Sequence, residues 1–307
     1  MKIYEGLSEF KPVPNPVVTS GTFDGVHLGH QKILQRIREI ARSIHGETIL
    51  LTFWPHPRLV LYPEEHNLRL LSTFEEKTKL LRQFGIDHLI TIPFTKEFSQ
   101  MSSKEFIQKM LVDKIHTRKL VIGYDHRFGK NREGSFEYLQ EHASDFGFEL
   151  EEISRQDVDA IGVSSTKIRK ALESGDIQTA NSFLGRSYEL NGIVIKGQQI
   201  GRSIGFPTAN VHIPNSYKLI PKDGVYAVEA EVNGNLYKAM LNIGNRPTVD
   251  GTQKSVETHL FDFQGDLYGK QITIYLRAYL REEQKFESLA ALQAQLLKDQ
   301  QQAKMLL

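Results

Sequence analysis

An apolar run, a glycine-rich turn and an amphipathic helix follow one another between residues 16 and 44. Pro16–Ser20 has the length and composition of a buried strand, and glycines interrupt the segment directly after it. From Gly29 to Ile44 the apolar residues recur every three or four positions, which predicts a helix with one buried face. A strand that passes through a tight turn into such a helix is typical of a parallel sheet with helices on its faces. This segment therefore constrains the possible folds more than any other.

Two histidines stand where this helix is expected to begin. His27 and His30 are three residues apart and would lie on the same side of the helix. They would also lie beside backbone N–H groups without helical partners, at the positive end of the helix dipole. Gly21, Gly25 and Gly29 leave room for a phosphate chain to approach the backbone. The arrangement suits chemistry that needs hydrogen-bond donors on a polyphosphate, although each piece taken separately is common in α/β proteins without such a function.

Taken together, residues 17–31 resemble the signature of the HxGH nucleotidyltransferase superfamily. The run T-F-D-G-V-H-L-G-H-Q at residues 22–31 is similar to its flavin-adenylylating branch. That branch forms the N-terminal half of the bacterial bifunctional riboflavin kinase/FMN adenylyltransferases. The resemblance implies that His27 and His30 are catalytic and that Gly21, Phe23 and Asp24 bind ATP or FMN.

The composition is that of an ordinary globular chain. Its 307 residues favour two domains, and its net charge of +1 gives no indication of a nucleic-acid or membrane partner. The absence of cysteine excludes disulfides, thiolate metal sites and cysteine nucleophiles. The first residues show no signal-peptide pattern, and no apolar run has membrane-spanning length. We therefore expect a cytoplasmic protein that acts on small molecules, as a monomer or weak homo-oligomer.

Strand and helix patterns alternate up to about residue 154. The expected strands are residues 16–20, 47–53, 87–94, 119–123 and 148–154. The expected helices are residues 29–44, 73–85, 102–115 and 135–146. Capping boxes, Thr73 with Glu76 and Ser102 with Glu105, open the second and third helices. The alternation predicts an α/β, Rossmann-like fold with a doubly wound parallel sheet, whose ligands bind at the carboxyl ends of the strands.

Two turns at such strand ends carry further candidate residues. His56, in T-F-W-P-H-P at residues 52–57, could face the site, but a purely structural loop is nearly as good an interpretation. In the charged loop of residues 123–134, Asp125 can accept a hydrogen bond from a ribose or base, and Arg127 can bind phosphate. Flavin adenylyltransferases usually have D-F-R-F-G or N-F-x-F-G here. His126 stands where a Phe is usual, which leaves the contact of that side chain open.

The segment V-S-S-T-K-I-R-K-A-L at residues 163–172 has the pattern of a helix start with hydroxyls and cations in its first turns. Ser165, Thr166 and Arg169 could bind the phosphates of a nucleotide. The same pattern also fits an ordinary capped surface helix. Superfamily members have a similar S-S-T-x-I-R segment over the nucleotide phosphates, and the resemblance implies that role for these three residues.

The pattern changes after Gly185, which predicts a domain boundary between residues 1–185 and 186–307. Short β-rich runs without intervening helices follow at residues 188–195, 208–213, 224–232, 236–243, 256–263 and 271–280. They predict a small antiparallel β-barrel. A C-terminal helix completes this half, and we expect it to pack through its leucines, Leu289, Leu292, Leu296 and Leu297.

Two strands of this half carry candidate residues. Thr208 and Asn210 are two apart on a predicted strand and therefore face the same side. Their oxygens could hold Mg²⁺ together with substrate phosphates. In V-E-T-H-L-F-D at residues 256–262, Glu257 could face either the barrel interior or the solvent.

An ordered series of motifs in this half resembles riboflavin kinase: G-x-x-I-G-F-P-T-A-N, P-K-D-G-V-Y, N-I-G-N-R-P-T, V-E-T-H-L-F-D-F and L-Y-G-K-Q-I-T-I-Y-L-R. The resemblance implies that Thr208 and Asn210 contact the metal and phosphates and that Glu257 is the catalytic base. It also implies that further residues bind ATP or flavin, namely Gly201, Gly205, Phe206, Pro207, Arg246 and Arg277.

Both resemblances together imply a bifunctional enzyme that uses ATP and Mg²⁺ to convert riboflavin to FMN, and then FMN to FAD and pyrophosphate. Three other interpretations stay open. The chain could be a monofunctional FMN adenylyltransferase whose barrel only binds flavin, but the intact P-T-A-N and V-E-T-H segments count against this. It could be an HxGH transferase for another acceptor, an account in which the barrel motifs have no place. It could also be a flavin- or nucleotide-sensing protein without turnover, which lacks a nucleic-acid-binding stretch to act through.

Overall fold

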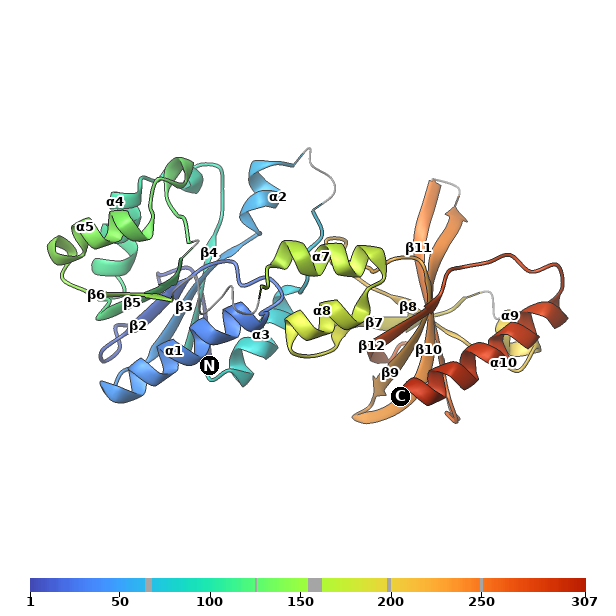
Figure 1. Cartoon of the computed structure of the whole chain (residues 1–307). Coiled ribbons are helices and arrows are strands. Elements are labelled where there is room, and N and C mark those ends of the chain that lie inside the picture. The colour runs from blue at the N-terminus through green and yellow to red at the C-terminus, as the bar shows by residue number, and fades with distance from the viewer. Residues whose placement is uncertain (64–67, 125, 154–161, 198–199, 249–250) are drawn as a thin grey trace. The chain divides into compact units, whose positions relative to one another are not determined.

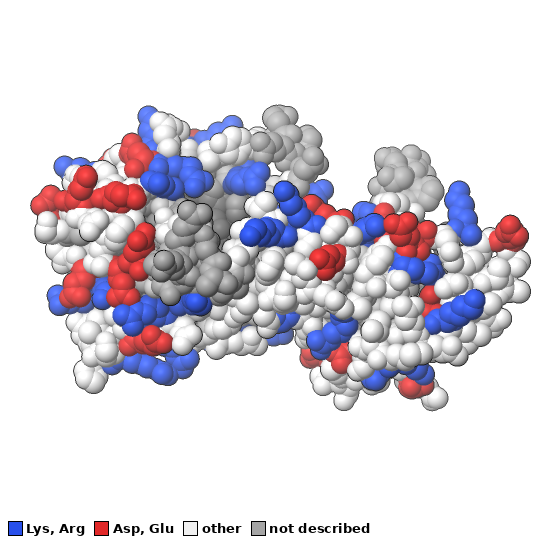
Figure 2. Space-filling model, in the orientation of Figure 1, with Lys and Arg blue, Asp and Glu red and all other residues white. Residues whose placement is uncertain are grey.

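The computed structural model describes residues 1–63, 68–124, 126–153, 162–197, 200–248 and 251–307 (Figure 1). The chain forms two compact units, residues 1–164 and 165–307. On the face drawn in Figure 2, basic and acidic side chains are interspersed without a large region of one sign, in keeping with the net charge of +1. Among the described residues, no helix is long and apolar enough to cross a membrane.

The first unit is built on a six-stranded sheet in the order β1-β4-β3-β2-β5-β6, in which every neighbouring pair is parallel. The strands are β1 (Lys2–Glu5), β2 (Val17–Ser20), β3 (Thr48–Trp54), β4 (His88–Pro93), β5 (Lys119–Gly123) and β6 (Glu149–Ile153). The predicted parallel sheet is confirmed. β1 is additional, because a short edge strand with mostly exposed side chains has no apolar pattern to reveal it.

Helices cover both faces of this sheet. They are α1 (Leu28–Ser43), α2 (Pro57–Leu61), α3 (Phe74–Gln83), α4 (Ser103–Phe106) and α5 (Phe136–Phe146). Apolar residues of α1 and α3 form one buried cluster with Val17, and those of α4 and α5 form another with Val18. Because consecutive strand residues point to opposite faces, the sheet is buried on both sides, as a doubly wound fold requires. Ligand-binding groups are therefore left to the ends of the strands.

Both predicted capping boxes are formed. The Thr73 and Ser102 side chains accept a hydrogen bond from the backbone N–H three residues later, and Glu76 and Glu105 accept from the backbone N–H of the capping residue. The predicted helix after Ser102 is present, but it continues as a π-helix over Ile107–Val112. Apolar periodicity does not distinguish these two hydrogen-bond patterns over so short a segment.

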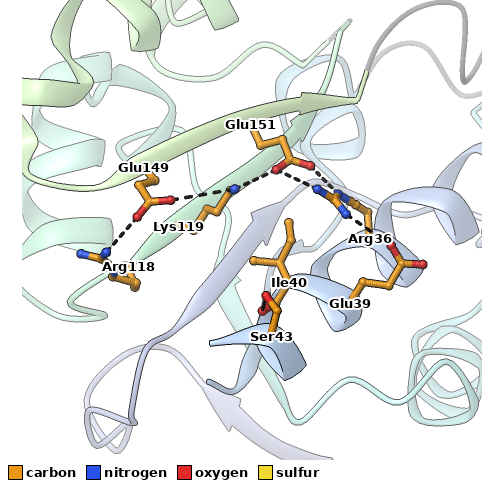
Figure 3. A network of polar contacts seen from close by, with 8 residues as sticks. All are labelled: Arg36, Glu39, Ile40, Ser43, Arg118, Lys119, Glu149 and Glu151. Carbon is orange, nitrogen blue, oxygen red and sulfur yellow. Dashed lines mark hydrogen bonds and ion pairs between the residues drawn. The ribbon is translucent and has the colours of Figure 1, made fainter. Parts of the chain in front are cut away.

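A chain of ion pairs links α1 to the β5–β6 edge of the sheet (Figure 3). Arg36 of α1 lies 2.5 Å from Glu151 of β6, measured from Nε to Oε1, and the Lys119 ammonium of β5 lies 2.8 Å from the same carboxylate. Glu149 and Arg118 extend the network along the two strands. Because the Arg36 side chain is 45% exposed, water screens its charge, and each such pair contributes only about 0–1 kcal/mol. The network orients the elements more than it stabilises them.

The second unit is a closed antiparallel barrel with the strand order β10-β11-β8-β7-β12-β9. The strands are β7 (Tyr188–Ile195), β8 (Ala209–His212), β9 (Gly224–Val232), β10 (Asn235–Thr248), β11 (Gly251–Leu260) and β12 (Gln271–Arg281). The predicted barrel is confirmed. Asn233 and Gly234 join β9 to β10 at positive φ angles of 51° and 78°, the conformation that a two-residue hairpin turn requires.

Helices α7 (Ser165–Ser174) and α8 (Ile177–Leu184) belong to the barrel's unit. The Asn181 side chain of α8 donates to the Leu276 carbonyl of β12 at 2.8 Å and accepts from the Tyr188 N–H of β7 at 2.7 Å. Gly185 ends α8 in the left-handed conformation. The compact units thus divide before these two helices. The boundary predicted after Gly185 divides the two expected activities rather than the compact units, and it stays a prediction.

The C-terminal helix α10 (Leu289–Leu306) is present, but its expected packing is partly wrong. Leu289 and Leu297 are 56% and 48% exposed, whereas Asp299 is only 1% exposed. The Arg281 guanidinium at the end of β12 donates to both carboxylate oxygens of Asp299, at 2.7 Å in the shortest contact. A charged pair, which apolar periodicity cannot reveal, therefore anchors the helix in place of those two leucines. A short helix, α9 (Ile200–Ser203), lies between β7 and β8.

Asp299→Ala should strongly destabilise the second unit, because it leaves the Arg281 guanidinium without its carboxylate. Breaking a buried ion pair from one side typically costs about 3–5 kcal/mol. The Arg281 side chain is still 20% exposed, so we expect the lower end of that range. Urea unfolding of the full chain measures the change, with the exposed neighbour Lys298→Ala as a control that should shift stability by less than about 0.5 kcal/mol. Equal stability of the two variants would contradict the anchoring role.

Candidate active sites

His27 and His30 lie at the start of α1, just beyond the carboxyl end of β2. His27 is the N-cap residue, and its Nδ1 atom accepts from the His30 backbone N–H at 3.4 Å. In the neutral ring, the proton of His27 is therefore on Nε2, which is left as a donor. The two rings are stacked, with centroids 3.7 Å apart and 15° between their planes. The structure thus brings the predicted pair together at a helix start that attracts anions.

The surroundings hold His30 neutral. Burial lowers its pKa well below the usual value, and His27 and Lys77 lower the pKa further. The Phe23 ring lies beside it, with 4.8 Å between centroids, and a Cβ on Gly21 would come within 3.1 Å of the Phe23 ring. His30 Nδ1 is buried and has no hydrogen-bond partner in the described part of the chain. Native proteins satisfy nearly all such atoms, and the exceptions often belong to functional sites.

Lys77 of α3 is a residue of this site that the sequence analysis missed. Its side chain is buried, and its ammonium donates to the Thr22 carbonyl in the glycine-rich turn and to Thr52 Oγ1 in β3, at 3.2 Å in both cases. Burial lowers the pKa of Lys77 to about 8. A signal was available, because Lys77 shares the apolar face of the predicted helix with Phe74 and Leu80.

Asp24 supports the turn from within. Its buried carboxylate accepts from the Leu71 N–H at 3.0 and 3.1 Å and from the Ser72 N–H at 3.1 Å. Ser72 Oγ in turn accepts from the Gly25 N–H at 3.1 Å. Three backbone N–H groups are thereby satisfied, which makes the conformation of the turn costly to change. Asp24 therefore positions the histidines through the backbone.

His126 follows β5 and reaches the end of β2. Its Nε2 atom shares a hydrogen bond of 3.0 Å with Ser20 Oγ, and its ring stacks on Phe128 with 5.7 Å between centroids. Burial, followed by the charge of Arg132, lowers the pKa of His126 to about 4, so the ring is neutral. This histidine stands where a Phe is usual. It keeps an aromatic ring at the position, stacked on Phe128, and adds a hydrogen bond to the end of β2.

In the second unit, a cavity of about 310 Å³ is lined by residues of β9, β10, β11, β12 and α10 and of the segment that leads to β8. Thr208 and Glu257 line it together, and Thr208 Oγ1 donates to Glu257 Oε2 at 3.2 Å. Glu257 pairs in register with Asn210 across β11 and β8, so their side chains project to the same side of the barrel wall. The open question about Glu257 is thereby decided, because its carboxylate faces the cavity.

A tight turn forms one edge of this cavity. The Gly201 carbonyl accepts from the N–H groups of Ile204 and Phe206, at 3.2 and 2.8 Å. A Cβ on Gly201 would come within 2.2 Å of the Phe206 carbonyl oxygen, so only glycine fits there. His259, a further lining residue, donates from Nδ1 to the Pro207 carbonyl at 2.7 Å and fixes the segment that leads to Thr208.

The cavity also contains a second carboxylate that the motifs did not indicate. Glu283 follows β12 and accepts from the Asn242 side chain at 3.0 Å. Asn242 pairs in register with Glu257. A Cβ on Gly244 would come within 2.1 Å of the Glu283 carboxylate, so a glycine at that position allows the approach. The apolar part of the lining comes from Ile204, Phe206, Val225, Met240, Leu241, Phe286, Leu292 and Leu296.

Known proteins resemble this chain along nearly its whole length. A family model described as FAD synthetase matches residues 11–167, and one described as riboflavin kinase matches residues 184–307. Proteins named bifunctional riboflavin kinase/FMN adenylyltransferase from Listeria monocytogenes and Escherichia coli are 38% and 36% identical to it. These alignments cover 94% and 98% of this chain and 91% and 96% of the relatives. The chain belongs to this family.

A solved structure shows the same fold. It comes from Streptococcus pneumoniae, is titled a macrolide-efflux protein, and matches with a TM-score of 0.90 at 28% identity over 99% of this chain and 98% of its own. Within the riboflavin kinase/FMN adenylyltransferase family, His27 and His30 fall in the part that matches FAD synthetase, whereas Thr208 and Glu257 fall in the part that matches riboflavin kinase.

Most of the other residues predicted for the adenylyltransferase part lie in the described part of the chain. His56 caps α2, where its Nδ1 accepts from the Arg58 N–H at 3.2 Å. Arg127 is exposed and lies 3.9 Å from the Glu137 carboxylate. Asp125 lies outside the described residues. Ser165, Thr166 and Arg169 occupy the first turns of α7, as predicted, and α7 belongs to the second unit.

Of the two arginines predicted for the kinase part, only Arg277 has a side chain in the described part of the chain. Arg277 of β12 is 45% exposed and donates to Glu229 and to Ser187 Oγ. It is not among the residues that line the cavity. Arg246 lies in β10, and its side chain is outside the described part of the chain. An arginine on a barrel strand is often paired with a neighbouring carboxylate, and Arg277 is an example.

Proposed function

We propose that this chain performs the two reactions of its family at two separate sites. Riboflavin is phosphorylated by ATP in the barrel, and the FMN formed is adenylylated by a second ATP at the histidine pair. Membership of the family supports both activities. The observation that carries the assignment of residues is that each signature forms a site. His27 and His30 stack at a helix start beside a buried cation, and Thr208 is bonded to Glu257 on a cavity wall.

In the adenylyl transfer, an oxygen of the FMN phosphate attacks the α-phosphorus of ATP, and pyrophosphate leaves. The incoming phosphate is itself the nucleophile, so the protein need only place donors where charge builds up. His30, which burial holds neutral, and His27 donate N–H groups to these oxygens. The role of Ser165, Thr166 and Arg169 as binders of nucleotide phosphates rests on the resemblance to the superfamily and stays a proposal. Residues 1–185 would therefore form the adenylyltransferase part and 186–307 the kinase part.

In the kinase reaction, the 5′-hydroxyl of riboflavin attacks the γ-phosphorus of ATP. Glu257 accepts the proton of that hydroxyl, and the bond from Thr208 holds the carboxylate in place. The cavity of about 310 Å³ has a mixed apolar and polar lining, which suits a flavin ring with a hydroxylated chain. Gly201 and Gly205 lie in the turn at its edge, where the backbone can follow the ATP phosphates.

A magnesium ion fits the donor set of the kinase part. Thr208 and Asn210 offer a hydroxyl and an amide oxygen beside the Glu257 carboxylate, and such hard oxygen donors are the ones that Mg²⁺ prefers. No group of three or more His, Asp or Glu side chains suited to a metal occurs in the described ranges, so substrate phosphates would complete the coordination. When bound, Mg²⁺ neutralises charge on the transferred group.

The remaining predicted binding residues stay proposals of this function. For ATP and FMN in the first part they are Gly21, Phe23, Asp24, His56, Asp125 and Arg127. For ATP and flavin in the second part they are Gly201, Gly205, Phe206, Pro207, Arg246 and Arg277. Because ATP is consumed in both reactions, we place the enzyme in the cytoplasm. We also propose that it is a monomer or weak homo-oligomer.

Product analysis tests the proposal directly. The purified chain with riboflavin, ATP and Mg²⁺ should form FMN first and FAD later, with release of pyrophosphate, and chelation of the metal should stop riboflavin phosphorylation. Chromatography separates the three flavins, and an incubation without ATP is the control. FAD formed only when FMN is supplied would identify a monofunctional adenylyltransferase. Flavin binding without either product would favour a sensing protein.

A further inference from the structure

A buried cation lies beside the histidine pair, and the proposed reaction gives it no role. Lys77 is only 4% exposed, although its ammonium must be desolvated to remain there. The ammonium lies 5.7 Å from the Trp54 ring centroid and 5.8 Å from that of Phe74. Both of its hydrogen bonds are to neutral oxygens, the Thr22 carbonyl and Thr52 Oγ1. A buried charge that is hydrogen-bonded to neutral acceptors is costly to desolvate and therefore calls for a function.

The charged and titratable groups around Lys77 come from the turn and from α1. Asp24 is the carboxylate that acts on it, and this carboxylate is also bonded to backbone N–H groups in the neighbouring loop. Lys77 acts in turn on His30, where its charge disfavours the imidazolium form, as does His27. The ammonium is thus coupled to the backbone of the turn through Thr22 and to the protonation of His30 through its charge.

We propose that Lys77 is a positioning residue for adenylyl transfer. Its ammonium holds the Thr22 carbonyl of the glycine-rich turn and places a positive charge where the polyphosphate of ATP binds. This inference rests on the function proposed for the first unit. The bound polyphosphate would supply the countercharge that the described residues around the ammonium supply only weakly, so the site is completed electrostatically by its substrate.

Lys77→Met tests the proposal, because methionine fills nearly the same volume without the charge. The rate of FAD formation from FMN and ATP should fall by about 10²–10³-fold, comparable to the loss of one preorganised donor. Riboflavin phosphorylation by the same variant should stay within about twofold, since it occurs in the other unit. Lys79→Met removes an exposed lysine from the same helix and should leave both reactions unchanged.

Two further readouts separate positioning from mere support of the fold. In the wild type, kcat/KM for ATP in FAD formation should fall as pH rises through about 8, where Lys77 loses its proton. Lys77→Met should show no such fall, and the pKa of its His30, followed by imidazole NMR, should be higher because a neighbouring cation is gone. Thr52→Val is nearly isosteric and removes one acceptor of the ammonium, so it should move the pH break to lower values.

The outcomes are distinct. FAD formation by Lys77→Met within threefold of the wild-type rate would overturn the proposal, and so would an unchanged pH break in both Lys77→Met and Thr52→Val. If Lys77→Met does not fold, the pH profile of Thr52→Val decides alone. A pH break at lower values supports the proposal, and an unchanged pH break overturns it. A wild-type chain that makes no FAD would instead refute the proposed function of the first unit, whatever Lys77 does.

Discussion

His30→Ala is expected to lower FAD formation from FMN and ATP by about 10²–10³-fold, the usual effect of removing one preorganised donor from a charged transition state. The His30 ring is half-buried, stacked on His27 and held neutral by its surroundings. It therefore acts as a fixed hydrogen-bond donor, and alanine removes that donor while His27 and the start of α1 remain. Single-turnover measurement of FAD formation, with ATP and FMN in excess over their binding constants, reports this loss in the chemical step.

The same variant carries its own control. Because the kinase cavity is in the other unit, riboflavin phosphorylation by His30→Ala should remain within about twofold of the wild-type rate. Folding should also persist, since His30 Nδ1 has no partner among the described residues and its removal breaks no side-chain hydrogen bond of that atom. A folded variant that loses both products would show that the two activities do not have separate sites.

Glu257→Gln is expected to produce the opposite pattern. The amide keeps the shape of the carboxylate and can still accept from Thr208, but it cannot take the proton of the riboflavin hydroxyl. Loss of a general base typically lowers the rate by about 10²–10⁴-fold. FAD formation from supplied FMN should be unchanged. A riboflavin-to-FMN assay under saturating ATP and Mg²⁺ measures the effect on kcat.

Glu283→Gln is the matched control for Glu257, because it alters a second carboxylate that lines the same cavity. Glu283 accepts from Asn242, whereas Thr208 donates to Glu257, so the loss of Glu283 should affect kcat much less than the loss of Glu257. Normal phosphorylation by Glu257→Gln would remove Glu257 from the role of base. A larger loss in Glu283→Gln than in Glu257→Gln would transfer that role to Glu283.

Much of the fold could be predicted because its signals are local. The β3 and β5 strands are apolar runs, α3 is opened by the Thr73–Glu76 capping box, and Asn233-Gly234 forms the β9–β10 turn. Each depends on residues within a few positions of one another, where backbone sterics and local hydrogen bonds dominate. The exposed edge strand β1 and the Asp299 anchor of α10 were missed, because both depend on partners distant in the chain.

The residues of the candidate sites likewise fall into those that local spacing predicts and those that it does not. His27 and His30 could be placed at one helix start, since spacing along a helix decides which side chains are neighbours. Thr208 and Asn210 could be placed on one side of a strand for the corresponding reason. Whether Glu257 faces the cavity could not be decided from its own strand, because both faces of β11 carry buried side chains, Thr258 and His259 among them.

The sequence by itself determined the order of strands and helices, the two site signatures and the family to which they belong. Only the tertiary structure decided that Lys77 lies under the phosphate turn, that Asp24 is bonded to Leu71 and Ser72, and that Glu257 faces Thr208. Local periodicity reports which face of an element is apolar. The partner of a buried charge, in contrast, is set by packing between elements far apart in the chain, and low dielectric makes those few contacts decisive for the chemistry.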